Sequence, residues 1–256
     1  MSRRTRRILI GLGTTVVLCG LYAWFFGFQT MMIWEMRKIS KRAPVVRLVP
    51  RSLPDSSVSS REGKTLSYFG YKFEVPWTDV DESKTKFYAT SAAIGFSSGK
   101  TIVFKILPPR EFVNAVLKET DERMFRQAYG ADALQSDYAM WSAAANSTPD
   151  KVTLFTPSKD IMASSMLLLL KATAAPEQSA IYSIQNTDFK GFQWGGPSAG
   201  PRHIVADLFA DDAGLEIMFF GPGKGQPLGI SQADINRVLQ TVHKTADTRD
   251  TQALNR

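Results

Sequence analysis

A run of 27 residues without a charged side chain, residues 8–34, is the feature that most constrains this chain. Its densest part, residues 8–28, is aliphatic and aromatic and lacks the polar face that a buried helix of a water-soluble protein shows. About 20 apolar residues in a helix span the hydrocarbon core of a bilayer. Tyr22, Trp24 and Trp34 are aromatic residues of the kind that lie at membrane interfaces. The sequence therefore predicts a transmembrane helix over residues 8–34.

The ends of this run indicate a retained signal-anchor. The run is longer than the core of an ordinary signal peptide, and the bulky residues 25–28 offer no small-residue cleavage site. We therefore expect residues 1–7 to be a basic cytoplasmic N-terminus, residues 8–34 to span the bacterial inner membrane and the globular domain to lie in the periplasm. Basic clusters flank both ends, so the reverse orientation stays open. These side chains are expected to contact anionic headgroups: Arg3, Arg4, Arg6, Arg7, Arg37, Lys38, Lys41 and Arg42.

The net charge of +7 is located beside the hydrophobic run. Residues 1–62 carry eleven Lys/Arg and three Asp/Glu, a net charge of +8, whereas residues 63–256 carry twenty and twenty-one, a net charge of −1. A domain that binds nucleic acid needs a basic face, so we expect no nucleic-acid partner. The single cysteine, Cys19, lies inside the run, so the globular part has no disulfide or cysteine-based metal site.

Composition divides the chain beyond the helix into three parts. Residues 35–62 are basic and then rich in proline and serine without an apolar period, which predicts a flexible juxtamembrane linker. Residues 63–246 have the hydrophobic content of a folded domain and are long enough to bury a core without staples. Residues 247–256 form a polar C-terminal tail.

The order of apolar patterns within residues 63–246 predicts an α+β domain with a mainly antiparallel, sandwich-like sheet and packed helices. Strands are expected over residues 65–69, 71–75, 86–96 and 101–107, and again over 180–185, 189–194, 203–209 and 215–220. Helices are expected over residues 110–129, 131–144 and 158–171, and a closing helix over 231–244. Ser231 and Asp234 have the spacing of a capping box at the start of that last helix.

The first expected strand pair ends in a recognisable sequence pattern. Tyr71, Phe73 and Val75 alternate with polar residues, and Pro76-Trp77 follow directly. This pattern, with a closing C-terminal helix, resembles the PsbP-like α+β sandwich domains. The resemblance implies a fold, and it implies diverse binding and assembly roles rather than one activity.

One motif suggests chemistry. Residues 95–99 match G-x-S-x-G, the pattern of a serine-hydrolase nucleophile elbow, with Ser97 as nucleophile. Asp207 and His243 follow in the chain order of that family, and His203 is a second candidate base. However, the elbow needs a helix after the serine, and residues 101–107 are rich in β-branched residues, which predicts a strand. A membrane-bound serine hydrolase is therefore the alternative hypothesis.

The main hypothesis is a membrane-anchored binding or assembly module without catalytic activity. The sequence contains no convincing catalytic constellation, and we expect no cofactor and no metal site. The expected partners are the lipid bilayer, through residues 8–34, and another envelope protein. Two loops rich in glycine and proline, residues 195–201 and 221–225, are candidate contact points.

Overall fold

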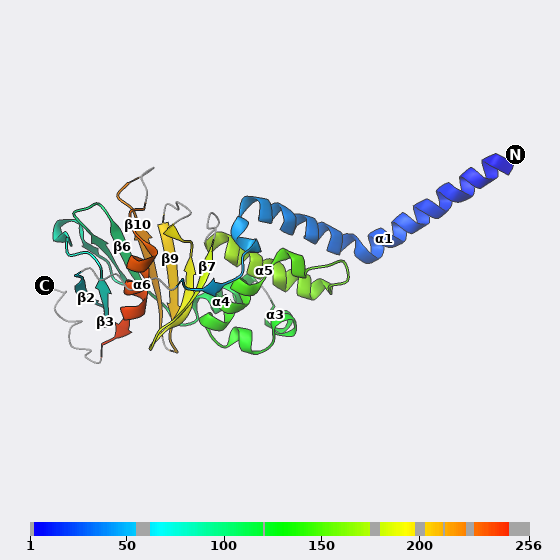
Figure 1. Ribbon diagram of the computed structural model, residues 1–256. Helices are drawn as coiled ribbons and strands as arrows, with labels where there is room; N and C mark the ends of the chain where they lie inside the picture. The colour runs from blue at the N-terminus through cyan, green and yellow to red at the C-terminus, as the bar shows by residue number, and fades with distance from the viewer. Residues whose placement is uncertain are drawn as a thin grey trace.

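The computed structural model describes residues 3–54, 62–119, 121–174, 180–197, 203–211, 213–223 and 228–245, and the side chains of all of these except 3–14, 16, 17 and 174. The globular part has three layers (Figure 1). Helices cover one face of a large mixed sheet, and a small sheet with one further helix covers the other face. The fold is α+β, as the sequence predicts.

Within the described residues, the large sheet has eight strands in the order β1-β7-β8-β9-β10-β6-β5-β4. Every neighbouring pair is antiparallel except β1 and β7, which are parallel. The long central strands are those that the sequence predicts from their β-branched and aromatic content. The strands are β1 (Arg51–Ser52), β4 (Lys86–Phe87), β5 (Ser91–Gly95), β6 (Thr101–Leu107), β7 (Ile181–Gln185), β8 (Lys190–Trp194), β9 (His203–Phe209) and β10 (Gly214–Phe220).

The helical layer packs on one face of the large sheet. Trp141 of this layer contacts Trp194 of β8, with ring centroids 4.8 Å apart, and both indoles are buried. Phe209 at the end of β9 joins the same apolar core. The layer consists of the inner part of α1 (Arg3–Arg42), the 3₁₀ turns η1 (Pro44–Arg47), η3 (Asp132–Leu134) and η4 (Pro149–Lys151), and α2 (Glu111–Glu119), α3 (Glu122–Tyr129), α4 (Asp137–Asn146) and α5 (Ser158–Ala174).

Lys171 of α5 is fully buried in this layer. Its Nζ donates hydrogen bonds to the carbonyl oxygens of Leu48 at 2.6 Å, Ala145 at 2.8 Å and Ser147 at 2.9 Å. Three acceptors use all three protons of an ammonium group, so the side chain joins α5 to the end of α4 and to the segment after η1. Burial, with a smaller contribution from the positive charge of Lys151, lowers the pKa of Lys171 to about 7.

The other face of the large sheet is covered by a small sheet and α6. The small sheet has the order β11-β3-β2, with antiparallel pairing throughout, in a second apolar core. Phe73 of β3 stacks on Phe104 of β6 at 5.3 Å between centroids, and this contact joins the two sheets. The elements are β2 (Lys64–Tyr68), β3 (Tyr71–Val75), α6 (Gln232–Thr241) and β11 (His243–Lys244), with the short turn η2 (Glu82–Lys84) outside them.

The segment expected to be a flexible linker differs from that expectation over most of its described length. α1 continues as a helix to Arg42, so residues 35–42 are helical. Met36 is 2% exposed, and Val45 and Val46 are fully buried against the helical layer. β1 then adds a parallel strand to the large sheet. Prolines and basic residues dominate the composition here, but a few apolar side chains anchor the segment; residues 55–61 lie outside the described part.

Several helix boundaries also differ from expectation: the helix expected over residues 131–144 is the turn η3 followed by α4, and α5 continues past residue 171 to Ala174. The single helix expected over residues 110–129 is two helices, because Asp121 adopts an extended conformation and its carboxylate accepts a hydrogen bond from the Met124 amide at 3.1 Å. The closing helix begins at the predicted capping box of Ser231 and Asp234, which is confirmed. It ends at Thr241, because the chain then extends into β11 and pairs with β3.

The segment expected to span the membrane, residues 8–34, is helical throughout, and its side chains are described at position 15 and from position 18 onward. α1 projects from the globular body as a long stem (Figure 1). Within the residues that the structure describes, we find no helix that meets both the length and the hydropathy needed to cross a membrane.

Candidate functional site

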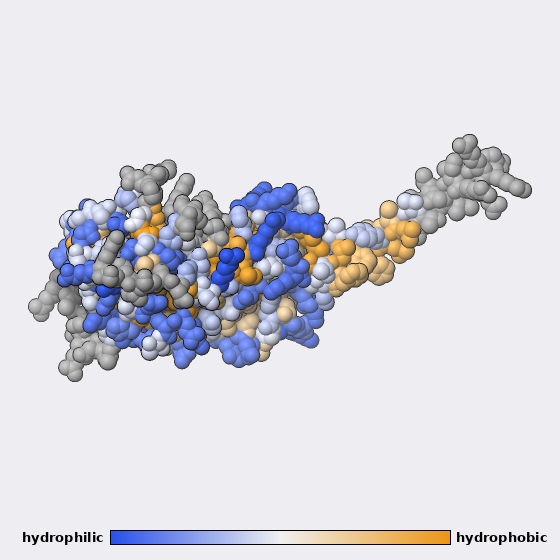
Figure 2. Space-filling view, viewed as in Figure 1, coloured by the Kyte–Doolittle hydropathy of each residue, from blue (hydrophilic) through white to orange (hydrophobic). Residues whose placement is uncertain are grey.

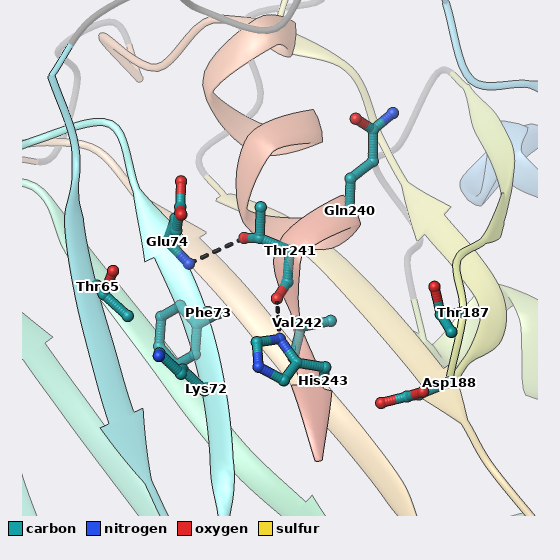
Figure 3. Close-up of a pocket in the computed structure, with 10 residues that line it drawn as sticks. All are labelled: Thr65, Lys72, Phe73, Glu74, Thr187, Asp188, Gln240, Thr241, Val242 and His243. Atoms are coloured by element: carbon teal, nitrogen blue, oxygen red, sulfur yellow. Dashed lines mark hydrogen bonds between the residues drawn. The ribbon is translucent and has the colours of Figure 1, made fainter. Parts of the chain in front are cut away.

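A polar groove of about 540 Å³ opens beside the small sheet (Figure 3). Three segments that are distant in the sequence form it: the strands β2 and β3, the C-terminal end of α6 with β11, and the turn between β7 and β8. Antiparallel pairing sets His243 of β11 directly opposite Lys72 of β3. The lining residues are Thr65, Lys72, Phe73, Glu74, Thr187, Asp188, Gln240, Thr241, Val242 and His243.

Asn186 fixes one wall of the groove. Its Nδ2 donates to the carbonyl oxygens of Leu239 at 2.8 Å and Val242 at 3.2 Å, at the end of α6. Its Oδ1 accepts hydrogen bonds from the amides of Asp188 at 3.0 Å and Phe189 at 2.7 Å. One amide side chain therefore shapes the β7–β8 turn and also satisfies carbonyl groups that a helix end leaves unpaired.

The opposite wall is held by α6. The Thr241 hydroxyl accepts a hydrogen bond from the Glu74 amide at 2.9 Å, and the guanidinium of Arg237 lies 3.2 Å from the Glu74 carboxylate. The amide of Lys244 donates to Asp188 Oδ2 at 2.9 Å. These contacts join β3, α6 and the β7–β8 turn, so the groove is supported on all its sides.

The groups that face the groove suit recognition of a polar ligand. His243 Nδ1 lies 2.8 Å from the Thr241 carbonyl oxygen (Figure 3). Because a carbonyl only accepts, Nδ1 carries the proton, and Nε2 is the acceptor in the neutral ring. Lys72 supplies a cation, Asp188 an anion, and Thr65 and Thr187 supply hydroxyls. Donors and acceptors of both charges therefore line one polar concavity.

Replacing Asn186 by alanine is expected to destabilise the domain by about 2 kcal/mol, since it leaves two carbonyls and two amides without their partner. Urea unfolding followed by circular dichroism measures the change. The matched control is Thr187→Ala, at the exposed neighbouring position, for which we expect a change within about 0.5 kcal/mol. Equal midpoints for the two variants would show that Asn186 does not hold the wall.

Ser97, the nucleophile of the alternative hypothesis, lies in a hairpin turn between β5 and β6. The Phe96 amide donates to the Lys100 carbonyl at 3.0 Å, and Gly99 has a φ of 84°, which closes the turn. His203 begins β9, which is separated from β6 by β10, and His243 lies in the small sheet. A strand follows the serine instead of the helix that an elbow needs, and no observation favours the hydrolase.

Asp207, the proposed acid of that hypothesis, is instead buried beneath the helical layer. Trp194 Nε1 donates to Asp207 Oδ2 at 2.8 Å, whereas Oδ1 has no hydrogen-bond partner within the described part of the chain. Glu216 of β10 lies directly opposite, and Lys105 of β6 lies opposite Glu216. Burial, followed by the negative charge of Glu216, raises the pKa of Asp207 to about 8. The carboxyl group is therefore mostly protonated at neutral pH.

We also searched the described residues, including the pair Asp207 and Glu216 and the groove, for a metal centre. Among the residues that the structure describes, no group of three or more histidine, cysteine, aspartate or glutamate side chains is placed to hold a metal ion. Of the two glycine-rich loops, residues 198–201 and 224–225 lie outside the described residues. In the described part of the first loop, Gly195 has a φ of 94°. In the described part of the second loop, residues 221–223 pack beside the Ser97 hairpin near Gly99.

No family model matches the sequence. No curated protein matches it either. The likeness to PsbP-like sandwiches thus rests on residues 71–77 and on the order of the elements, and the function of the chain has to be argued from its own residues.

Sequence reasoning did not find the groove. Its polar residues fall in three short segments, around positions 72, 188 and 242, that share no motif and lie up to 170 positions apart. The available signal was Asn186, an amide placed between two strands where a turn is expected. An asparagine in a turn also has an ordinary local explanation, so it does not predict a groove by itself.

Proposed function

We propose that this chain is a single-pass membrane-anchored binding or assembly module without catalytic activity. The observation that carries this proposal is the projecting part of α1, where large apolar side chains are exposed without any charge between them. Trp24 is 85% exposed and Phe25 is 62% exposed. Figure 2 shows apolar residues gathered along the stem. The exposed side chains are Leu18, Leu21, Tyr22, Trp24, Phe25, Phe28, Met31 and Trp34.

A bilayer gives these side chains the apolar surroundings that water does not. Isolated exposed apolar residues are ordinary on a protein surface, but a continuous apolar surface marks a site of interaction. Residues 8–34 have the length for a single crossing. We propose that they form the anchor in a bacterial inner membrane, with residues 1–7 in the cytoplasm.

The junction between anchor and domain supports an assembly role. α1 continues without interruption from the stem into the helical layer, where Met36 is buried and Met32, Ile33 and Ile39 pack on the core. The globular part is thus joined to the anchor through a packed helix. Arg37, Lys38, Lys41 and Arg42 follow the apolar run, and we expect them to contact anionic headgroups.

The groove beside the small sheet is the proposed binding place for a partner of the envelope. Its lining combines charged groups of both signs with apolar side chains, and it is built by a strand, a helix end and a turn that hold one another. Its lining contains hydrogen-bonding side chains. No cluster of metal-ligating side chains is found among the described residues. These properties suit an extended peptide or a polar small molecule.

The anchor is tested by membrane extraction of the full chain. We expect the chain to stay in the membrane pellet after alkaline carbonate washing, and the double variant Leu18→Lys/Leu21→Lys to move to the supernatant. A lysine at the centre of a spanning helix costs roughly 3 kcal/mol, so two weaken insertion by several orders of magnitude. Phe87→Lys/Tyr88→Lys, at exposed apolar positions of the domain, is the matched control and should stay in the pellet.

The orientation of the chain in the membrane is measured in a bacterial host with C-terminal reporter fusions. We expect the alkaline-phosphatase fusion to be enzymatically active and the green-fluorescent-protein fusion to be non-fluorescent. The reason is that a short N-terminus with four arginines stays in the cytoplasm. Release of the unaltered chain by carbonate would overturn the anchor. A bright fluorescent fusion with an inactive phosphatase would reverse the orientation and direct the partner search to the cytoplasm.

A further inference from the structure

The turn between η4 and α5 lies against the stem of α1. Phe155 in this turn contacts Phe26 edge to face, with ring centroids 6.0 Å apart. Phe155 is nevertheless 85% exposed. Two threonines shape the turn: the Thr153 amide donates to Thr156 Oγ1 at 2.9 Å, and the Phe155 amide donates to Thr153 Oγ1 at 3.3 Å. The turn therefore presents an aromatic ring outward beside the proposed anchor.

The level of Phe155 relative to a bilayer follows from its contact with α1. At about 1.5 Å per residue, residues 8–28 cover about 30 Å, the thickness of the hydrocarbon core. Phe26 lies near the domain end of this stretch. Phe155 is held beside Phe26, so its ring falls at the boundary between acyl chains and headgroups. Aromatic residues are favoured at that boundary.

The surroundings of Phe155 fit the same position. Met162, about two turns further along in α5, is 45% exposed. Lys151 and Lys159 flank the turn on either side, and their ammonium groups donate hydrogen bonds to the Asn146 carbonyl at 2.7 Å and to Gln127 Oε1 at 3.0 Å. Asp150 and Asp160 lie beside them, so the flanks are mixed in charge. We therefore expect electrostatic attraction to anionic lipid to contribute less to membrane binding by this turn than burial of its apolar side chains.

We propose that the η4–α5 turn, with Phe155 at its tip, inserts into the interfacial region of the leaflet at which α1 leaves the membrane. This inference rests on the proposed anchor and adds a second membrane contact, 129 positions along the chain from Phe26. The surface of the turn is continuous with the stem through the contact between the two rings. Two contacts fix the tilt of the domain relative to the bilayer, which one spanning helix alone leaves free.

Depth-dependent fluorescence quenching tests the insertion on the full chain in vesicles of phosphatidylcholine and phosphatidylglycerol. In a Cys19→Ser background, an environment-sensitive fluorophore is placed by Phe155→Cys, and lipids carry a nitroxide near the headgroup or at the bilayer centre. We expect severalfold stronger quenching of the label at 155 by the shallow nitroxide than by the deep one. Phe25→Cys in the stem is the positive control. Tyr88→Cys, exposed next to the edge strand β4, is the control that should not be quenched.

The outcomes separate this inference from the anchor. Quenching at position 25 without quenching at 155 would overturn the insertion and leave the anchor intact. Absence of quenching at both positions would overturn the anchor as well. A label at 155 that is shielded from aqueous iodide but not quenched by either lipid would show that a second copy of the chain covers Phe155, which also overturns the insertion.

Discussion

Replacing Asp207 by asparagine is expected to stabilise the protein at pH 8 and to change its stability little near pH 4. Asp207 is 3% exposed, and burial with the charge of Glu216 raises its pKa to about 8. In the unfolded chain an aspartate has a pKa near 3.9. Between these two values the folded state holds a proton that the unfolded state releases. The contribution of this carboxyl group to the stability of the unaltered protein therefore falls as the pH rises from about 4 to about 8.

The expected size of this effect follows from the interval of about four pH units. Each unit of pKa difference corresponds to about 1.4 kcal/mol, so the penalty at pH 8 approaches about 5 kcal/mol. Asparagine has a similar shape, does not ionise, and keeps an oxygen acceptor for the Trp194 indole. The gain in the variant is smaller than the full penalty, because the new amide group also needs partners in a buried place.

Chemical unfolding at a series of pH values measures the prediction. The free energy of unfolding of Asp207→Asn should lack the part of the downward slope between pH 4 and pH 8 that we expect from Asp207 in the unaltered protein. The matched control is Asp211→Asn, two residues after the end of β9 at an exposed position, which should keep the slope. If Asp207→Asn and the unaltered protein had parallel pH profiles, the buried carboxyl group would not be the source of the slope.

Replacing Lys171 by methionine is expected to destabilise the protein by about 3 kcal/mol at pH 6. Methionine has a similar length but donates no hydrogen bond, so the carbonyls of Leu48, Ala145 and Ser147 lose their buried partner. Each unpaired carbonyl costs about 1–3 kcal/mol. Removal of the buried charge recovers part of this loss. Lys159→Met, at an exposed position of the same helix, should change stability by less than about 0.5 kcal/mol.

The pH dependence of this residue has the opposite sign to that of Asp207. Burial lowers the pKa of Lys171 to about 7, whereas the unfolded lysine titrates near 10.4. Between these values the unfolded chain holds a proton that the folded protein has released, so stability rises with pH from about 7 to about 10. Lys171→Met should show no such rise when its unfolding is measured over that interval. A variant with an unchanged slope and stability would contradict the role of the ammonium group.

The strands and the closing helix could be predicted because their patterns are local. Residues 71–75 alternate apolar and polar side chains, and β3 buries Tyr71, Phe73 and Val75 as that pattern requires. Ser231 and Asp234 make the capping box that their spacing predicts, with both reciprocal hydrogen bonds formed. In each case the residues that form the pattern lie within or next to a single element, so the local sequence alone predicts the structure.

The parts that could not be predicted depend on contacts between distant segments. Val45 and Val46 are buried, although two apolar residues among prolines and cations form no period that would reveal it. Asp207 follows the alternation of β9 onto the helical face, but only the packing of the helical layer shows that this position is sealed from water. The groove needs β3, α6 and the β7–β8 turn together, and no one of these segments contains a motif.

The position of the groove relative to α1 limits which molecules can occupy it. The stem leaves one end of the globular part, whereas the small sheet and α6 lie at the other end (Figure 1). In the proposed arrangement, with residues 8–28 in the bilayer, the groove lies at the end of the domain most distant from the lipid. A membrane helix running alongside would touch the stem and the η4–α5 turn and would fall short of His243. In that arrangement the occupant would have to extend outward from the membrane plane by roughly the depth of the domain, as a long segment of a neighbouring protein or a freely diffusing molecule does.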